Sequence, residues 1–133
     1  MPAIVQAQAN KILDLTLGTS SPTMFTGAAK VRLTTTAPSA TAAGTELTGT
    51  GYTAGGSTIS FSAASAGATT GPTSTLQWTN SSGSSWSIVG VEIWDSAGTA
   101  LRWWYGTFTG QPIIVANGNI FQISIGAISV SLG

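Results

Sequence analysis

The amino-terminal segment carries apolar residues at helical spacing. Residues 3–17 read AIVQAQANKILDLTL, in which Ala and Gln are good helix formers, and Gly18 follows where helices commonly end. The residues that fall on one stripe of such a helix are Ile4, Val5, Gln8, Ile12 and Leu15. We therefore predict a helix over residues 3–17, within an N-terminal helical arm that spans residues 1–18.

Beyond residue 18, apolar and polar residues alternate in short runs separated by turn-forming residues. Alternation of this kind predicts strands with one buried face. The predicted strands cover residues 29–35, 57–63, 74–80, 86–95, 100–108, 112–116, 119–125 and 127–133. About seven or eight short strands at this spacing indicate an all-β fold, an antiparallel β-sandwich that forms a single domain over residues 19–133.

Two of these runs make more specific predictions. Residues 86–95, WSIVGVEIWD, are apolar on both faces of an extended chain, which favours a central strand covered on both sides. One predicted face holds Val89, Val91 and Ile93, and the other holds Trp86, Ile88 and Trp94. Near the carboxyl end, PIIVA and NIFQISI flank the dipeptide Asn117-Gly118, which predicts a hairpin with a two-residue turn.

Three segments rich in small residues connect the early strands. Residues 34–46 and 62–75 consist largely of Thr, Ala, Gly and Ser, and we interpret both as extended surface loops. Residues 49–56, GTGYTAGG, could in principle hold a phosphate. A phosphate loop, however, precedes a helix and usually contains a Lys, whereas this stretch leads into a predicted strand. We predict a turn with backbone angles that only glycine adopts readily.

Charge is scarce in the 133-residue chain. Charged residues make up 6% of it, against about 25% in typical domains, and the net charge is zero. They are Lys11, Lys30, Arg32, Arg102, Asp14, Glu46, Glu92 and Asp95. Because a basic stripe is missing, we expect neither nucleic acid nor a membrane surface as partner. Such a surface is either a solvated coat of hydroxyls and glycines or one that neighbouring subunits cover.

The same inventory argues against catalysis. The chain has no His and no Cys, which removes the commonest general base, thiol nucleophiles and thiolate metal sites. Glu92 and Asp95 are the only close acids, and their odd spacing on a strand predicts opposite faces. We therefore predict no enzyme activity, no catalytic residue, no metal site and no cofactor.

Five aromatic residues crowd into the twenty residues 86–105, and three roles remain open for them. They are Trp86, Trp94, Trp103, Trp104 and Tyr105. They can belong to the core, to a subunit interface or to a platform on which sugars stack. The candidate glycan-stacking residues are Trp103, Trp104 and Tyr105. The candidate docking residues are Ile4, Val5, Ile12, Leu15, Trp94 and Trp104.

The order of motifs resembles a family of small virion proteins of tailed bacteriophages. The motifs are KVRLTTTAPSATAAGTEL, GTGYTAGGSTISFSAASAG, LQWTN, WSIVGVEIWDSAGTALRWWYG and SVSLG. Such proteins are labelled tail fibre or minor tail proteins, and similar β-sandwich proteins decorate phage heads. One departure is that Thr53 and Ala54 follow Tyr52, where relatives tend to have an Arg. The resemblance implies a structural, non-enzymatic role in the virion, after synthesis in the cytoplasm of the host bacterium.

Position in the virion is the remaining question. A fibre shaft needs heptads, a strand repeat or a long rod, and the chain shows none of these, so it resembles a compact knob. We therefore expect a head decoration or minor capsid protein that docks through apolar contacts. The alternative is a tail fibre or minor tail protein with a receptor- or glycan-binding role. The expected partners are major capsid or tail proteins and further copies of the chain, with a trimer as one candidate assembly.

Overall fold

A computed structural model describes residues 2–132 and contains one helix and mostly short antiparallel strands. The helix is α1 (Gln6–Thr16). The strands are β1 (Ala3–Ile4), β2 (Lys30–Thr34), β3 (Ser57–Thr58), β4 (Ala68–Gly71), β5 (Leu76–Thr79), β6 (Trp86–Ile88), β7 (Gly90–Trp94), β8 (Arg102–Thr107), β9 (Ile113–Val115), β10 (Ile120–Ile123) and β11 (Ile128–Ser131).

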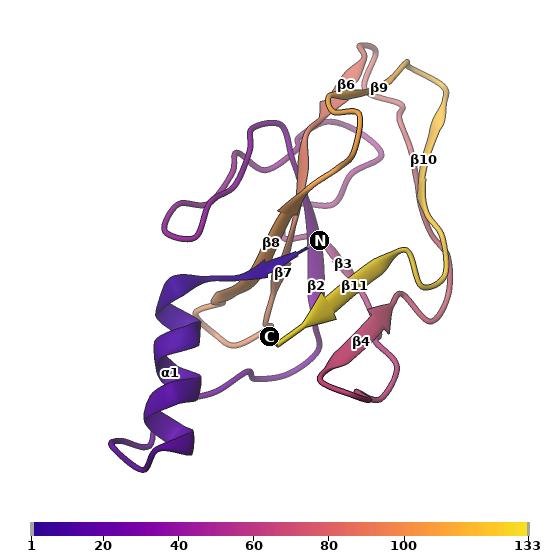
Figure 1. Ribbon diagram of the computed structural model, residues 1–133. Coiled ribbons are helices and arrows are strands. Elements are labelled where there is room, and N and C mark those ends of the chain that lie inside the picture. Colours follow the sequence, from indigo (N-terminus) through magenta and orange to yellow (C-terminus); the bar gives the residue numbers. More distant parts are fainter. Residues whose placement is uncertain (1, 133) are drawn as a thin grey trace.

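The largest sheet has the strand order β1-β8-β7-β2-β3, and all its neighbours are antiparallel. In strand β2 of this sheet, apolar residues at alternate positions are buried, as the sequence pattern predicted. Val31 and Leu33 of β2 are fully buried and lie opposite Ile93 and Val91 of β7. The strands of this sheet run through the centre of Figure 1, with α1 beside β8 and β1.

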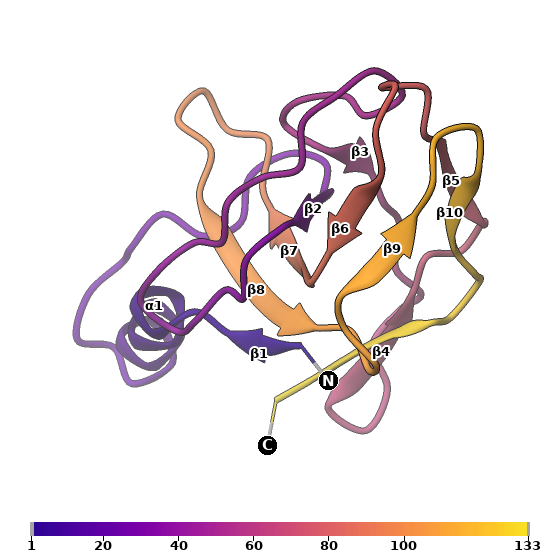
Figure 2. The same ribbon diagram turned by 90° about the horizontal axis from the view of Figure 1, so that it is seen from above.

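Three two-stranded pairs complete the fold: β10 with β5, β11 with β4, and β6 with β9. Seen from above, these pairs and the large sheet surround a common interior, while α1 lies outside it (Figure 2). The buried cluster that fills this interior consists of Val31, Leu33, Leu47, Ile59, Trp78, Trp86, Ile88, Val91, Ile93, Val115, Phe121, Ile123, Ile128 and Val130. The predicted all-β, antiparallel architecture with one short helix is confirmed.

The start of the helix is shifted relative to the prediction. Residues 3 and 4 form β1, which pairs with Tyr105 and Trp104 of β8. Val5 is still extended, with φ −66° and ψ 136°, and its N–H donates to the carbonyl of Trp103 over 2.9 Å. Because this hydrogen bond continues the sheet, the helix begins only at Gln6. The predicted 3–17 helix is therefore shorter at its amino end.

The predicted single strand over 86–95 is two strands with different partners. β6 pairs with β9, whereas β7 pairs with β2 and β8. Between them the N–H of Val89 donates to the carbonyl of Thr34. Side-chain direction changes at this junction, so Trp86 and Ile88 reach the same core as Val91 and Ile93. The predicted division of these four residues between two opposite faces is wrong.

The predicted hairpin across Asn117-Gly118 is also wrong, although a turn does form there. Gly118 has a positive φ of 89°, as a tight turn requires. The two arms then diverge, since β9 pairs with β6 and β10 pairs with β5. The cause is Asn80, a fully buried side chain at the turn. Its backbone donates to the carbonyl of Asn119 and accepts from the N–H of Gly118, which occupies the place of a hairpin partner.

Two predicted segments differ in length and type. The strand predicted over 57–63 is regular only at Ser57–Thr58, after which Ser62 donates from its N–H to the carbonyl of Thr70. Residues 68–71, predicted as loop, form β4 and pair with β11. The sequence of β4 consists of small residues without apolar alternation. This strand therefore forms through pairing with β11 and could not be predicted from its own sequence pattern.

The glycine-rich stretch is the predicted turn. Gly49, Gly51, Gly55 and Gly56 all have positive φ, between 85° and 121°. A Cβ on Gly51 would also collide with the carbonyl oxygen of Thr79. Positive φ and close backbone approach explain why glycine occupies these positions.

Candidate functional surface

Glu92 lies within the fold and binds three donors. Its side chain is 2% exposed, and Oε1 accepts from the N–H of Gly44 over 2.8 Å and from Arg102 over 3.3 Å. Oε2 accepts from the indole N–H of Trp94 over 2.9 Å. The carboxylate thereby joins β7, β8 and the 35–46 loop. It serves as a structural anchor with its oxygens already occupied.

Asp95 has the same character at the end of β7. It is 1% exposed and accepts hydrogen bonds from the N–H groups of Leu101 and Ala97 and from the indole of Trp103. Burial by itself raises the pKa of Asp95, but these hydrogen bonds outweigh it and hold the pKa below the usual value. A carboxylate stabilised in its charged form in this way is a poor general acid at neutral pH.

The register between β7 and β8 gives the carboxylates of Glu92 and Asp95 different hydrogen-bond partners. The pairing of β7 with β8 shifts between Ile93 and Trp94, so Glu92 meets Arg102 while Asp95 meets Trp103. The two carboxylates share no hydrogen-bond partner within residues 2–132. They form two separate anchors.

A third anchor surrounds Glu46. Its Oε1 accepts from the hydroxyl of Tyr52 and from the N–H of Gly55, each over 2.8 Å, and the guanidinium of Arg32 lies 4.0 Å from Oε2. The Tyr52 hydroxyl also accepts from the N–H of Leu33. Burial, together with the neighbouring Glu46 carboxylate, raises the pKa of Tyr52 well above its usual value. Tyr52 thus remains a neutral hydrogen-bonding residue that fixes the glycine-rich turn.

The remaining charges are also engaged within the chain. Lys30 donates to the hydroxyl of Thr58 over 2.8 Å, and Asp14 accepts from the hydroxyl of Thr19 over 2.9 Å. Lys11 lies over the ring of Trp103, with its Nζ 5.7 Å from the ring centre. Within the described residues, each of the eight charged side chains has a partner in its own chain, and three of them, Glu92, Asp95 and Arg102, are buried. The outer surface therefore offers hydroxyl, amide and apolar groups to a partner, and few ionic ones.

The helix residues predicted for docking are distributed differently from the prediction. Val5 is buried at 7% exposure, and Ile4 and Ile12 are partly buried, so these residues mainly hold the arm to the sheet. Leu15 is 45% exposed and remains available as a docking residue. The only buried residue of α1 is Gln8, which donates from Nε2 to the carbonyl of Arg102.

The most exposed apolar residues near the end of the helix were missed. Leu13 is 56% exposed and Leu17 is 73% exposed. Sequence reasoning placed the functional face on the stripe that contains most of the apolar residues. That stripe faces the sheet, and a helix held to its sheet by a polar Gln8 leaves leucines on the other side. The i, i+4 spacing of these two leucines was the signal that could have identified them.

Of the five clustered aromatic side chains, Trp86 and Trp103 are buried, and Trp94 and Tyr105 are partly buried beside arginines. Trp103 is 3% exposed and donates its indole N–H to Asp95, so the prediction of Trp103 as a glycan-stacking ring is wrong. Trp94 is partly buried, and Arg32 lies over its ring at 3.9 Å from the ring centre. Tyr105 is partly buried, with the Arg102 guanidinium 5.5 Å from its ring centre. Each of these rings thus contacts a charged side chain of its own chain.

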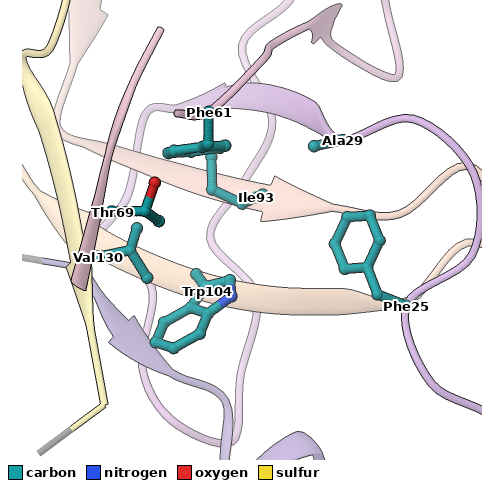
Figure 3. A pocket seen from close by; sticks show the side chains of 7 residues that line it. All are labelled: Phe25, Ala29, Phe61, Thr69, Ile93, Trp104 and Val130. Carbon is teal, nitrogen blue, oxygen red and sulfur yellow. The ribbon is translucent and has the colours of Figure 1, made fainter. Parts of the chain in front are cut away.

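Trp104 is different, because hollows lie beside it. One has a volume of about 260 Å³ and is shown in Figure 3, where the rings of Phe25, Phe61 and Trp104 come from separate segments. Its lining residues are Phe25, Ala29, Phe61, Thr69, Ile93, Trp104 and Val130. The second, of about 240 Å³, also contains Trp104, Thr69 and Val130. Together they form what we call the Trp104 groove, an apolar depression between β8 and the β4–β11 pair.

Neither part of the Trp104 groove is lined by a charged side chain among the described residues. Sequence reasoning identified Trp104 but not Phe25 or Phe61. Phe25 lies in a segment without periodic pattern, and its proximity to Trp104 comes only from tertiary folding. Within residues 2–132, no cluster of three potential metal ligands occurs, and no helix is long and apolar enough to span a bilayer.

The chain is similar to a known family of phage proteins. A family model described as Podophage GP4 fiber I protein gp80 matches residues 3–131, which is nearly the whole chain. Comparison with curated proteins gives no match.

Proposed function

The chain belongs to the podophage GP4 fiber I protein gp80 family, and on that premise we propose that it is a globular, non-catalytic unit of a podophage tail fibre. Membership makes it a structural protein of the phage virion. The finer proposal is that the chain contacts neighbouring virion proteins through uncharged surface. The observation that carries it is the internal use of all eight charged side chains among the described residues.

The family description changes the expected position in the particle. It names a fibre protein, so it gives no support to the head decoration role expected above and agrees better with the tail fibre alternative. A globular unit without a shaft repeat suits a terminal or connecting position in a fibre. Contacts to the other virion proteins would then involve the exposed leucines of α1 and the Trp104 groove.

Absence of catalysis is part of the proposal. Glu46, Glu92 and Asp95 each accept at least two hydrogen bonds from their own chain. A general acid or base must reach a substrate proton, and these oxygens accept instead from backbone N–H groups, indoles, the Tyr52 hydroxyl and the Arg102 guanidinium. The fourth acid, Asp14, is exposed on the helix beside Thr19, far from any second carboxylate in sequence.

Immunogold labelling of virions tests the position directly. Antibodies raised against the recombinant chain are expected to place gold at the tail, and quantitative mass spectrometry is expected to find few copies per particle. Gold distributed over the head, with hundreds of copies per particle, would contradict the fibre proposal and restore the head decoration role. Pre-absorption of the antibodies with the purified chain provides the control.

A second candidate function is receptor or glycan binding in the Trp104 groove. The supporting observation is one indole bordered by two apolar hollows, because sugar faces and apolar side chains both stack on such rings. Glycan-array or host-cell binding that is lost in Trp104→Ala, with an unchanged circular dichroism spectrum, would support this function. Binding that persists in Trp104→Ala, or no binding by the unmodified chain, would contradict it.

A further inference from the structure

The connection between β9 and β10 contains the dipeptide Asn117-Gly118, at the end of the molecule where β6 and β9 lie (Figure 1). Both residues are exposed. Asparagine is a chemically labile residue, since its side-chain amide can be lost as ammonia. A glycine that follows it has no Cβ, so the glycine nitrogen is left unhindered as the attacking group. The exposed turn therefore contains a candidate modification site.

Deamidation at such a pair is an intramolecular reaction. The nitrogen of Gly118 loses its proton and attacks Cγ of Asn117, the Cγ–Nδ2 bond breaks, and ammonia leaves with the proton. A five-membered succinimide ring results. Water then opens the ring at either carbonyl, which yields aspartate or isoaspartate at position 117. Water is the only co-reactant that this sequence of steps consumes.

The turn holds the two reacting atoms apart. The N–H of Asn119 donates to the carbonyl of Ala116 over 3.0 Å, which closes a four-residue turn. Gly118 has a φ of 89°, whereas φ of Asn117 is negative, since Ala66 is the only non-glycine residue with positive φ within residues 2–132. These signs define a type II turn, in which ψ of the first central residue is about 120°. The ring closes only when the Gly118 nitrogen eclipses Cβ of Asn117, about a third of a rotation from that ψ.

Two further hydrogen bonds hold the reacting groups in place. The N–H of Gly118 donates to the carbonyl of Asn80 over 2.6 Å, so the attacking nitrogen keeps its proton. Oδ1 of Asn117 accepts from the N–H of Gly83 over 2.9 Å, which fixes the orientation of the side-chain amide. Both partners belong to the connection between β5 and β6. Two loops that are distant in sequence are thereby joined at the reactive pair.

Asn80 is itself firmly held. Its side chain is fully buried and donates to the carbonyls of Ser84 and Val115, each over 2.8 Å. Its Oδ1 accepts from both the N–H and the hydroxyl of Ser82. The turn can therefore reach the geometry of ring closure only after its contacts with Asn80 have opened.

We propose that Asn117 is a site of spontaneous deamidation that the folded chain keeps closed, and that the contacts of Asn80 set its rate. The reaction proceeds from the small population in which the turn has opened. Its rate is then the rate of the unfolded chain multiplied by that population, as for other reactions that need local opening. The inference stands whether or not the fibre proposal holds.

The modification changes both the charge and the backbone of this turn. A carboxylate at position 117 adds one negative charge to a chain whose net charge is zero. In isoaspartate the main chain runs through the side-chain carbons, so the turn gains one backbone atom and its spacing to Asn80 changes. Because neither product reverts to asparagine, every opening of the turn adds to a permanent change between β9 and β10.

Reaction rates in the folded and the unfolded chain test the proposal. The purified chain is incubated at mildly alkaline pH with and without enough guanidinium chloride to unfold it, and peptide mass spectrometry follows each asparagine. Asn117 is expected to react at least tenfold more slowly in the folded chain. Asn10 and Asn119, which are exposed but precede Lys11 and Ile120, are internal controls and should react slowly in both samples. A difference smaller than tenfold at Asn117, or no reaction in the unfolded chain, would overturn the inference.

A mild variant tests the role of Asn80 in a chain that stays folded. Ser82→Ala removes one hydroxyl that donates to Asn80 and leaves the backbone N–H that also donates, and circular dichroism confirms the fold. Deamidation at Asn117 is expected to rise about threefold to tenfold, the effect of losing one hydrogen bond. Hydrogen exchange of the Gly118 amide should rise by the same factor, because the same opening exposes it. Ser85→Ala, at an exposed residue outside these contacts, is the matched control, and equal rates in the two variants would contradict the assignment to Asn80.

Discussion

The indole N–H of Trp103 donates to Oδ2 of Asp95 over 3.1 Å, in a place where both side chains are almost completely buried. The same carboxylate accepts from the N–H of Leu101 over 2.8 Å and so closes the loop between β7 and β8. Trp103, a candidate for sugar stacking in the sequence analysis, and Asp95, an acid for which no catalytic role was predicted, are thus each other's partners. Their contact stabilises the fold and removes both from the exposed surface.

Replacement of Asp95 by Asn is expected to lower the free energy of unfolding by about 1–3 kcal/mol. Asn keeps one acceptor oxygen for Leu101, but its NH₂ group faces the Trp103 indole, so two donors meet. Urea denaturation of both proteins measures the difference. Asp14→Asn, at an exposed acid with one hydroxyl partner, is the matched control and is expected to stay within about 0.5 kcal/mol.

The Asp95 carboxylate should also make the stability of the fold depend on pH. Because hydrogen bonds lower the pKa of Asp95 in the folded state despite its burial, its stabilising contribution is present at neutral pH. It is lost as the pH falls below the unfolded value of about 3.9 and through the folded value. Thermal melts between pH 7 and acid are expected to show a steeper decline for the unmodified chain than for Asp95→Asn. Parallel curves would contradict this assignment.

The buried ion pair between Glu92 and Arg102 is expected to stabilise the fold. Glu92→Ala leaves the buried Arg102 guanidinium without its anion and the Gly44 N–H without its acceptor, so we expect a loss of about 3–5 kcal/mol. Adding Arg102→Met should restore part of that loss, since no unpaired charge then remains. Denaturation of the two single variants and the double variant gives the coupling energy. Strict additivity would show that the pair does not interact.

Asn80 should be among the most sensitive positions of the fold. Its side chain donates to the carbonyls of Val115 and Ser84, both over 2.8 Å, and accepts from Ser82. Asn80→Ala leaves these buried groups without their hydrogen-bond partner. It is expected to lower the free energy of unfolding by at least about 2 kcal/mol. Hydrogen exchange should rise at β9 and β10. Asn119→Ala, at an exposed side chain beside the same turn, is the control and should change little.

The glycine-rich turn predicts a contrast between two alanine substitutions. Gly51→Ala combines a φ of 101° with a clash against the Thr79 carbonyl, so folded protein is expected to be strongly destabilised. Gly98→Ala meets open space at an ordinary φ and is expected to be neutral or slightly stabilising. Thermal melts compare the two. Similar melting temperatures for both variants would contradict the backbone argument.

Local pattern was sufficient for part of this fold. Val31 and Leu33 alternate with charged neighbours, so their strand and its buried face followed from a period of two residues. The turn over residues 49–56 followed from glycine density, because few other residues adopt positive φ. Such features depend only on residues that are neighbours in the sequence, so they can be predicted from the sequence alone.

Features that depend on distant partners were not predictable in this way. Asn80 separates the arms of an apparent hairpin only because folding brings it to Gly118, 38 residues later. Likewise, Leu13 and Leu17 lie on the outer side of the helix because Gln8, on the side that faces the sheet, finds a carbonyl on β8. The Trp104 groove joins Phe25 and Val130 from opposite ends of the chain. Nothing in the local pattern at these residues indicates which distant partner they meet.

The central claim is that this chain functions in a phage fibre through uncharged surface, its ionic groups being committed to its own fold. The most direct measurement is rebinding of purified chain to virions that lack it, at salt concentrations between about 0.05 and 0.5 M NaCl, where the screening length shortens about threefold. The account predicts an affinity that changes less than about twofold over this range. An affinity that falls tenfold or more would show that ionic contacts hold the chain in the particle, and would contradict the claim.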